Sequence, residues 1–265
     1  MRDLLADFPR QVGSKAHNRQ IMTENIQIGL SIGNSRYHWA WFLNTKLQSS
    51  WDTEYLTIDR SFDLFPIDLQ SIIKTHPIPI YLISVVPSQT LIWQQLPQVK
   101  QITLADMPLL NLYPTLGIDR ALAVFGAGET YGYPVLVIDG GTALTITGID
   151  DNRRLIGGAI LPGLRLQLRS LATGTTALPE IELPQQLPPR WSDNTPRSIA
   201  SGILYTVSAG ISDFIRDWRQ LYPDSQIIFT GGDGELLTGY LQVNSINRFR
   251  FNRDLLFYGL LAVLS

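Results

Sequence analysis

The chain of 265 residues has no cysteine, only three histidines and a formal net charge of −2. The lack of cysteine excludes disulfides, thiolate nucleophiles and zinc–thiolate sites, and it fits a reducing cytoplasm. The histidines show neither HExxH nor another paired-ligand spacing, so zinc chemistry is not expected. Because the charge balance provides no basic field, binding of nucleic acid is not favoured.

Several sequence signatures are also missing. The longest late apolar run, Leu255 to Leu264, is too short to cross a bilayer, so no membrane partner is expected. Residues 1–21 contain no apolar segment of a secretory signal, and we interpret them as a loose N-terminal extension. The chain has no GxxxxGK[ST] and no GxGxxG before a helix, which disfavours P-loop enzymes and dinucleotide-dependent dehydrogenases.

The chain is organised around residues 135–150, which read VLVIDGGTALTITGID. The apolar run from Val135 to Ile138 is typical of a strand that is buried on both faces. In the turn that follows, Gly140, Gly141 and Thr142 offer backbone N–H groups that suit a phosphate, and a carboxylate at Asp139 beside it would need a cation. An Asp-Gly hairpin turn without any ligand is the alternative.

A similar strand-turn-strand segment lies near the N-terminus. Alternating apolar residues from Ile26 to Ile32 predict a strand, Gly33, Asn34 and Ser35 predict a turn, and residues 37–41 predict the returning strand. We call residues 33–35 the GNS corner and residues 140–142 the GGT corner. Both corners consist of small residues and end in a hydroxyl, so we interpret them as copies in a duplicated domain, with coincidence as the alternative.

Strands alternate with helices along the rest of the chain, which predicts an α/β fold. The apolar patterns predict helices over 63–75, 87–96, from 118 onward, from 164 onward, over 195–221 and over 254–264, and strands over 80–86, 101–104 and 227–230. We expect a half-domain over 22–114 and a second over 115–265, around a central cleft. Gly33, Gly140 and Gly231 each end a predicted strand, which is where α/β sheets bind ligands.

The sharpest group of candidate catalytic residues is Gly117, Ile118, Asp119 and Arg120. Asp119 falls in the first turn of an amphipathic helix, where it could serve as a general base for phosphoryl transfer. Helix N–H groups and the helix dipole are by themselves a sufficient structural reason for an aspartate at this position. The Arg120 guanidinium could bind a carboxylate or phosphate bidentately, or Arg120 could be a solvated helix residue.

Six motifs in this order resemble type III pantothenate kinase, a family of the acetate and sugar kinase, Hsc70 and actin superfamily. The motifs are IGNSRYHWA, LGIDRALAVFGA, VLVIDGGTALTI, GGAILPGLRLQLRSLATGTTALP, NTPRSIASGI and IIFTGGD. The resemblance runs from about Ile26 to the C-terminus. It implies a duplicated ribonuclease H-like fold, a cytoplasmic homodimer and ATP-dependent phosphorylation of pantothenate to 4′-phosphopantothenate, the first step of coenzyme A synthesis.

The same resemblance implies roles for individual residues. Asp119 matches the proton acceptor of the family, and residues 117–120 match its pantothenate-binding segment. Asp139 matches the site of an activating K⁺ or NH₄⁺, Thr142 an ATP contact, and Ser31 to His38 the first phosphate-binding stretch, with Mg²⁺ expected beside ATP. Thr195 matches a threonine that contacts pantothenate, sometimes from the partner subunit, although it would also make a good helix N-cap. Tyr113 is a candidate for the family's pantothenate-contacting tyrosine, after a shorter loop.

Two residues depart from the family pattern. Ser31 stands where the family has aspartate, so Mg²⁺ would have to rely on ATP oxygens, water or another carboxylate. His38 stands where the family tends to have a basic residue, often lysine, so it would offset less phosphate charge at neutral pH. Two rival functions therefore stay open at this point: another small-molecule kinase of the sugar type, and a non-catalytic nucleotide-binding regulator.

Overall fold

The computed structural model describes residues 25–55, 77–242 and 249–265. The N-terminal extension 1–21 and the helix predicted over 63–75 lie outside these described residues. The strands are β1 (Ile26–Ile32), β2 (Tyr37–Leu43), β3 (Lys46–Thr53), β4 (Ile80–Ser84), β5 (Val99–Gln101), β6 (Val135–Gly140), β7 (Ala143–Ile149), β8 (Leu155–Pro162), β9 (Gln226–Thr230) and β10 (Arg250–Phe251). The α-helices are α3 (Pro87–Trp93), α4 (Ile118–Tyr131), α5 (Leu164–Gly174), α6 (Thr195–Leu221), α7 (Gly234–Gln242) and α8 (Leu255–Leu264).

The strands form two five-stranded sheets with the same topology. Sheet 1 has the order β3-β2-β1-β4-β5, and sheet 2, read from β8, has the order β8-β7-β6-β9-β10. In each sheet the first strand along the chain pairs antiparallel with the next strand and parallel with a later one. This repetition confirms the duplicated α/β fold that the two corners predicted.

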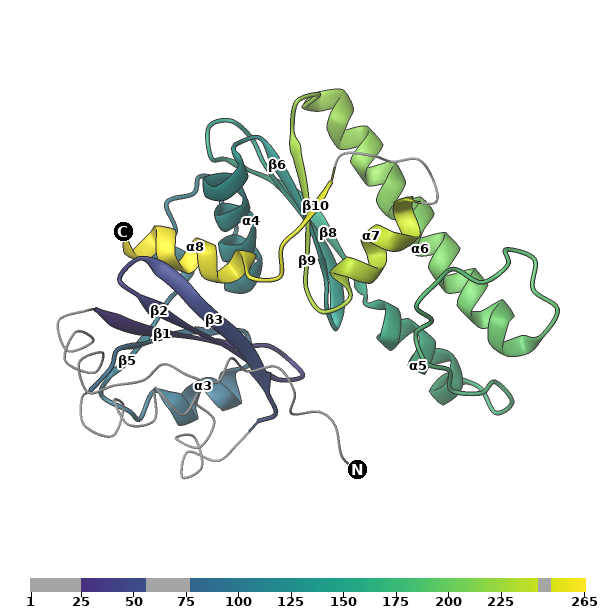
Figure 1. Ribbon diagram of the computed structural model, residues 1–265, viewed down its shortest axis with the longest axis horizontal. Coiled ribbons are helices and arrows are strands. Elements are labelled where there is room, and N and C mark those ends of the chain that lie inside the picture. The colour runs from purple at the N-terminus through teal and green to yellow at the C-terminus, as the bar shows by residue number, and fades with distance from the viewer. Residues whose placement is uncertain (1–24, 56–76, 243–248) are drawn as a thin grey trace, which may run out of the picture.

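Helices α4 and α8 lie between the two sheets (Figure 1). Their axes come very close, because a Cβ atom on Gly126 of α4 would overlap the carbonyl oxygen of Leu255 in α8. One hydrophobic cluster accordingly joins Phe42 of sheet 1 and Val137 of sheet 2 to both helices. The C-terminal helix thus packs against elements from both halves of the chain.

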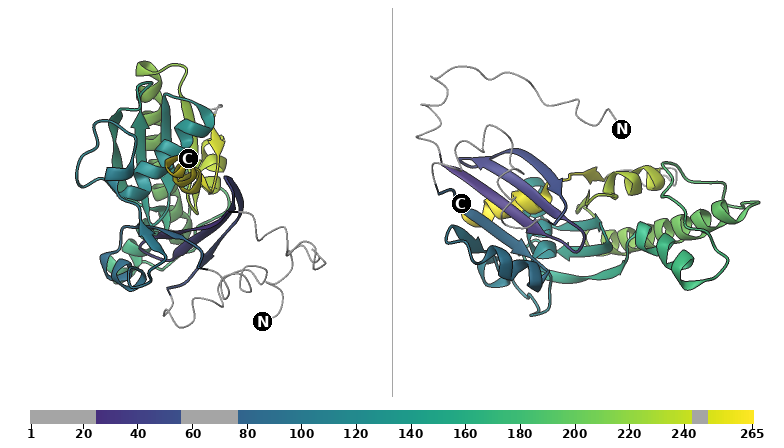
Figure 2. Two further views of the ribbon diagram at one scale, coloured as in Figure 1. Left: turned by 90° about the vertical axis from the view of Figure 1, so that its left-hand side faces the viewer. Right: turned by 90° about the horizontal axis from the view of Figure 1, so that it is seen from below.

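The outer faces of the sheets are covered separately. Below sheet 1, Trp93 of α3 packs edge-on against the rings of Tyr37 and Trp39 of β2. The outer face of sheet 2 packs against α5, α6 and α7. Figure 2 shows that α5, α6 and the connection between them extend as an arm away from sheet 1.

Helix α6 is long and apolar enough to cross a membrane by length and composition alone. Its most apolar 18-residue window has a mean hydropathy of 1.3, and 44% of that window is buried inside the molecule. Core helices of soluble proteins have the same properties, so this helix is weak support for a membrane span.

Some predicted elements differ from the structure. The strand predicted over 101–104 is instead β5, which ends at Gln101 and is followed by a 3₁₀ turn over Leu104–Asp106. The Thr103 backbone and side chain bond the Asp106 carboxylate, and this local capping favours the turn. The helix predicted over 195–221 is present as α6, but its apolar residues are not all buried, since Phe214 is 45% and Leu221 64% exposed.

Candidate active site

Asp119 lies in the first turn of α4, as predicted. Its Oδ1 atom accepts a hydrogen bond from the backbone N–H of Arg120 at 2.8 Å. Burial raises the pKa of the Asp119 carboxyl, while the N–H group and the guanidinium of Arg120 oppose that rise. A Cβ atom at position 117 would overlap Oδ1, so Gly117 makes the space that the carboxylate occupies. A carboxylate with a raised pKa is a better proton acceptor than an ordinary one.

Asp139 lies at the end of β6 and faces the same site. Burial raises its pKa to about 7, the charge of Asp119 adds to the rise, and Arg120 opposes it. Because this coupling requires proximity, the two carboxylates belong to one site. Among the contacts of the described residues, none provides the Asp139 side chain with a hydrogen-bond donor. A partly buried carboxylate in this state is suited to bind a cation.

The end of β9 closes one side of this site. Gly231 has a φ of +82°, a conformation that glycine adopts without strain. A Cβ atom at position 231 would overlap Oδ1 of Asp139. The backbone N–H of Asp233 donates to the carbonyl oxygen of Gly140 at 2.8 Å. The third glycine turn therefore supports the GGT corner directly.

The two glycine corners touch each other. The Ser35 hydroxyl of the GNS corner lies 2.8 Å from the Thr142 hydroxyl of the GGT corner, across 107 residues of sequence. Both residues are exposed, so their hydroxyl and backbone groups are accessible to a ligand. The structure thus brings Gly33, Asn34 and Ser35 together with Gly140, Gly141 and Thr142, and it places Asp139 directly beside them.

Arg120 is buried and holds a fixed position above sheet 2. Its Nε atom donates to the Thr147 hydroxyl at 3.1 Å, Nη1 to the Tyr113 hydroxyl at 3.1 Å and Nη2 to the Ile146 carbonyl at 3.3 Å. Only 8% of Arg120 is exposed, which decides against a solvated helix residue. A guanidinium has five N–H groups, so two remain for a carboxylate or hydroxyl of a ligand.

Ser31, His38 and Asp52 lie in one row across β1, β2 and β3. Nδ1 of His38 lies 2.6 Å from Asp52, and its Nε2 lies 3.8 Å from Asp254. Residues 29–33 formally match the GxSxG pattern of serine hydrolases, but Ser31 is buried inside a strand. No hydrogen bond joins Ser31 to His38 among the described contacts, so the row lacks the link between nucleophile and base.

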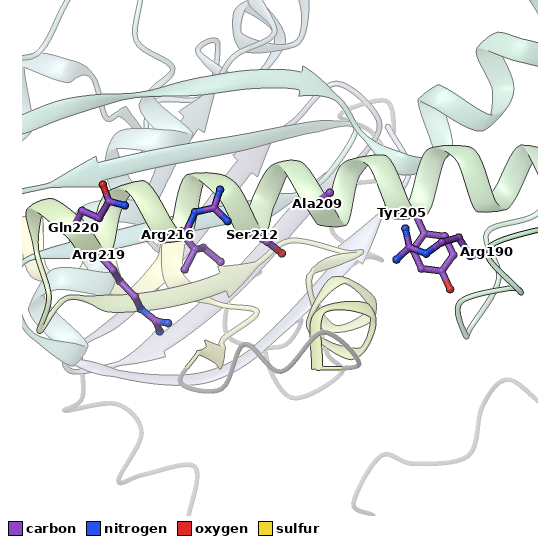
Figure 3. A pocket seen from close by; sticks show the side chains of 8 residues that line it. Arg190, Tyr205, Ala209, Ser212, Arg216, Arg219 and Gln220 are labelled. Atoms are coloured by element: carbon purple, nitrogen blue, oxygen red, sulfur yellow. The ribbon is translucent and has the colours of Figure 1, made fainter.

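Thr195 lies elsewhere. It is the first residue of α6, and the predicted N-cap role was wrong, because the Asn194 side chain caps the helix by accepting from the Arg197 N–H at 3.1 Å. Thr195 lines a cavity of about 560 Å³ with Leu178 and Ser198. A second cavity, of about 660 Å³, runs along α6 (Figure 3). Neither is lined by Asp119 or Asp139, and no described contact joins Thr195 to them.

The site fits cations only in part. No group of three or more His, Asp or Glu side chains in the described residues could hold a metal ion by itself. Mg²⁺ commonly binds through one or two carboxylates, with substrate phosphates and water completing its coordination. Asp139 beside the GGT corner is one carboxylate of this kind.

Sequence reasoning missed four residues around the site. Asp52 and Arg253 form an ion pair at 2.7 Å across 201 residues of sequence, which no local pattern could reveal. Thr147 and Gly158 surround the Arg120 guanidinium. Thr147 could have been found from the sequence, because a polar side chain in a strand between apolar neighbours needs a hydrogen-bond partner when it is buried.

Comparison with known proteins gives a consistent set of relatives. A family model of type III pantothenate kinase matches residues 28–217. The type III pantothenate kinase of a Nostoc species is 42% identical over 267 residues, covering 91% of this chain and 95% of the relative. The enzyme of the same description from a Synechocystis species is 45% identical over 239 residues, covering 89% of each chain.

Solved structures support the fold. A protein from Campylobacter jejuni described as a Baf family transcriptional activator matches with a TM-score of 0.61 and 21% identity, covering 89% of this chain and 96% of its own. The activator of 2-hydroxyisocaproyl-CoA dehydratase from Clostridium difficile matches with a TM-score of 0.51 and 11% identity, covering 90% and 92%. At these identities the likeness shows a shared architecture alone.

Proposed function

The chain belongs to the type III pantothenate kinase family, and we propose that Asp119 is the general base of its reaction. The protein is a kinase that uses ATP to phosphorylate pantothenate in coenzyme A biosynthesis. Family membership decides against the sugar-type kinase and the non-catalytic regulator. The observation that supports the role of Asp119 is its raised pKa, next to Asp139 and the two touching corners.

In the proposed arrangement the phosphates of ATP lie between the GNS and GGT corners, with Gly231 and Gly232 near the nucleoside. The backbone N–H groups of both corners and the hydroxyls of Ser35 and Thr142 are the donors available to the phosphates. Cations held at Asp139, a monovalent ion and Mg²⁺ shared with ATP, would supply positive charge where the phosphoryl group transfers.

Pantothenate would lie between Asp119 and Arg120. The carboxylate of Asp119 takes the proton of the primary hydroxyl as that oxygen attacks the terminal phosphate of ATP. The two unused N–H groups of Arg120 are placed to bind the substrate carboxylate or an oxygen of its amide. Gly117 and Ile118 contribute by starting the helix at the point where Asp119 must project.

Substitution of Asp119 tests the base directly. We expect Asp119→Asn to lower kcat at least ~100-fold while pantothenate binding changes little, because the amide keeps the shape and loses the basic oxygen. Pantothenate-dependent ADP release measures turnover, and calorimetric titration measures binding. Turnover equal to that of the unsubstituted enzyme would refute the assignment.

We also propose that the enzyme works as a homodimer and that Thr195 serves the site of the second copy. The proposal is supported by the place of Thr195 at the start of α6 in the arm, without a described contact to Asp119 (Figure 2). Mixing inactive Asp119→Asn and Thr195→Ala subunits should restore activity, because a mixed dimer has one site with both residues intact. Absence of any recovery in a dimer that exchanges subunits would show that Thr195 acts in its own chain or not at all.

A further inference from the structure

A group of charged residues joins the GNS corner to the start of α8. Its centre is the carboxylate of Asp52 on β3, which accepts from His38 Nδ1 at 2.6 Å, Arg36 Nη1 at 3.2 Å and Arg253 Nη2 at 2.7 Å. Arg36 directly follows the GNS corner, whereas Arg253 precedes α8 in the other half of the chain. Asp52 therefore bonds residues of both halves at once.

His38 makes a second connection between the halves. Its Nε2 atom lies 3.8 Å from Oδ1 of Asp254, and its ring lies over that of Phe257, with centroids 4.7 Å apart. Oδ1 of Asp254 is buried, and within the described residues it has no hydrogen-bond partner, so the His38 imidazole lies close to an unsatisfied oxygen. Among the described contacts, His38 therefore faces this charged group and does not reach the GGT corner.

The charged group is also continuous with both phosphate corners. On one side, Arg36 follows Ser35, whose hydroxyl touches Thr142. On the other side, the Arg253 carbonyl oxygen accepts from the Thr230 hydroxyl at 3.4 Å, and Thr230 pairs in register with Asp139. The Asp52–Arg253 pair is therefore connected through neighbouring residues to both corners.

The strength of the group follows from its charges. Burial by itself raises the pKa of Asp52, but the hydrogen bond from His38 and the two guanidinium groups outweigh it and bring the pKa to about 2. Asp52 is thus ionised at every working pH. Its side chain is 25% exposed, whereas the side chains of Arg36 and Arg253 are 60% and 53% exposed, so water screens both ion pairs in part.

We propose that Asp52 is a positioning residue for phosphoryl transfer, which holds the GNS corner and the GGT corner at the separation that ATP requires. The inference rests on the proposed position of ATP between the corners. Without the clamp formed by Asp52 and Arg253, the hydrophobic cluster around α4 and α8 would still join the halves, but the two corners would be held less firmly and ATP binding would have to fix their separation. Apparent affinity falls in proportion to the fraction of molecules in the competent arrangement.

The test uses Asp52→Asn and Arg253→Gln, singly and together, in the full-length enzyme. If the fraction of molecules with the two corners at the separation that ATP requires falls to about a tenth, KM for ATP rises about tenfold in each single variant. The kcat at saturating ATP and KM for pantothenate should change less than about twofold. The double variant should be no worse than Asp52→Asn alone, because Asp52→Asn already removes the ion pair that Arg253→Gln removes. Hydrogen exchange of the backbone amides of the GNS corner should be faster in the free Asp52→Asn variant and should return to the original rate with a nonhydrolysable ATP analogue.

The control is Asp213→Asn, which removes an exposed carboxylate paired with Arg216 on α6, and should leave KM for ATP unchanged. Unchanged KM for ATP in Asp52→Asn would overturn the proposal. So would a fall in both kcat and melting temperature without an ATP-specific effect, which would show a purely structural role. Failure of the base assignment gives a different result, since Asp119→Asn would then keep its turnover while ATP affinity still depended on Asp52.

Discussion

The partly buried carboxylate of Asp139 gives the most direct quantitative prediction. Its pKa is about 7 in the folded protein and 3.8 ordinarily, so the folded chain binds more protons than the unfolded chain between these values. Stability should therefore fall as pH rises through this window, and above pH 7 the full cost of the charge is present. Asp139→Asn removes this charge and keeps the shape of the side chain.

The magnitude follows from the pKa difference. The rise from 3.8 to about 7 corresponds to ~4 kcal/mol at most. Asparagine brings its own polar amide into the same site, so the substitution recovers only part of that cost. We expect the free energy of unfolding of Asp139→Asn to be ~2 kcal/mol higher than that of the unsubstituted enzyme at pH 8. For a chain of this length that gain raises the melting temperature by about 5 °C. At pH 5 Asp139 is mostly protonated when folded, so the gain should be less than half as large.

The assay is thermal unfolding of both proteins in tetramethylammonium chloride and in KCl. Potassium should raise the melting temperature of the unsubstituted enzyme, because it binds the folded state, and it should not raise that of Asp139→Asn. The substitution should also abolish potassium activation of pantothenate-dependent ADP release. The more stable variant is thus expected to be the less active one.

Two outcomes would refute this reasoning. If Asp139→Asn is no more stable than the unsubstituted enzyme at pH 8 without potassium, the carboxylate carries no electrostatic cost. If potassium stabilises both proteins equally, its site does not include Asp139.

Two further predictions concern packing and helix capping. Gly158→Ala should raise KM for pantothenate about tenfold or more and lower the melting temperature, because the new Cβ atom would overlap the carbonyl oxygen of Ile146 on the paired strand and lie 2.8 Å from Nη2 of Arg120. Gly202→Ala, with open space around it, is the matched control in steady-state kinetics and thermal unfolding. Asn194→Ala should destabilise the protein by ~1 kcal/mol, because it removes the N-cap of α6, whereas Thr195→Ala should leave the melting temperature unchanged. Equal melting temperatures for the two variants would contradict the capping assignment.

Much of the fold was predictable because its signals are local. Apolar periodicity located β1, β6, β9 and the long helix α6, and small-residue turns located the GNS and GGT corners. Two of the elements that were missed have weak local patterns. β3 is largely polar, and β8 contains Gly157 and Gly158 and exposes alternate residues, so neither has the apolar pattern of a buried strand.

By itself, the sequence determined the duplicated α/β fold and the family, because the order and spacing of short motifs can be read directly along the chain. Only the tertiary structure decided which polar groups meet. The contact of Ser35 with Thr142, the proximity of Asp119 to Asp139 and the bond of Asp52 with Arg253 all join distant segments. Periodicity reports which face of an element is buried, whereas pKa values and ion pairs depend on distances between elements, and those distances exist only in the folded chain.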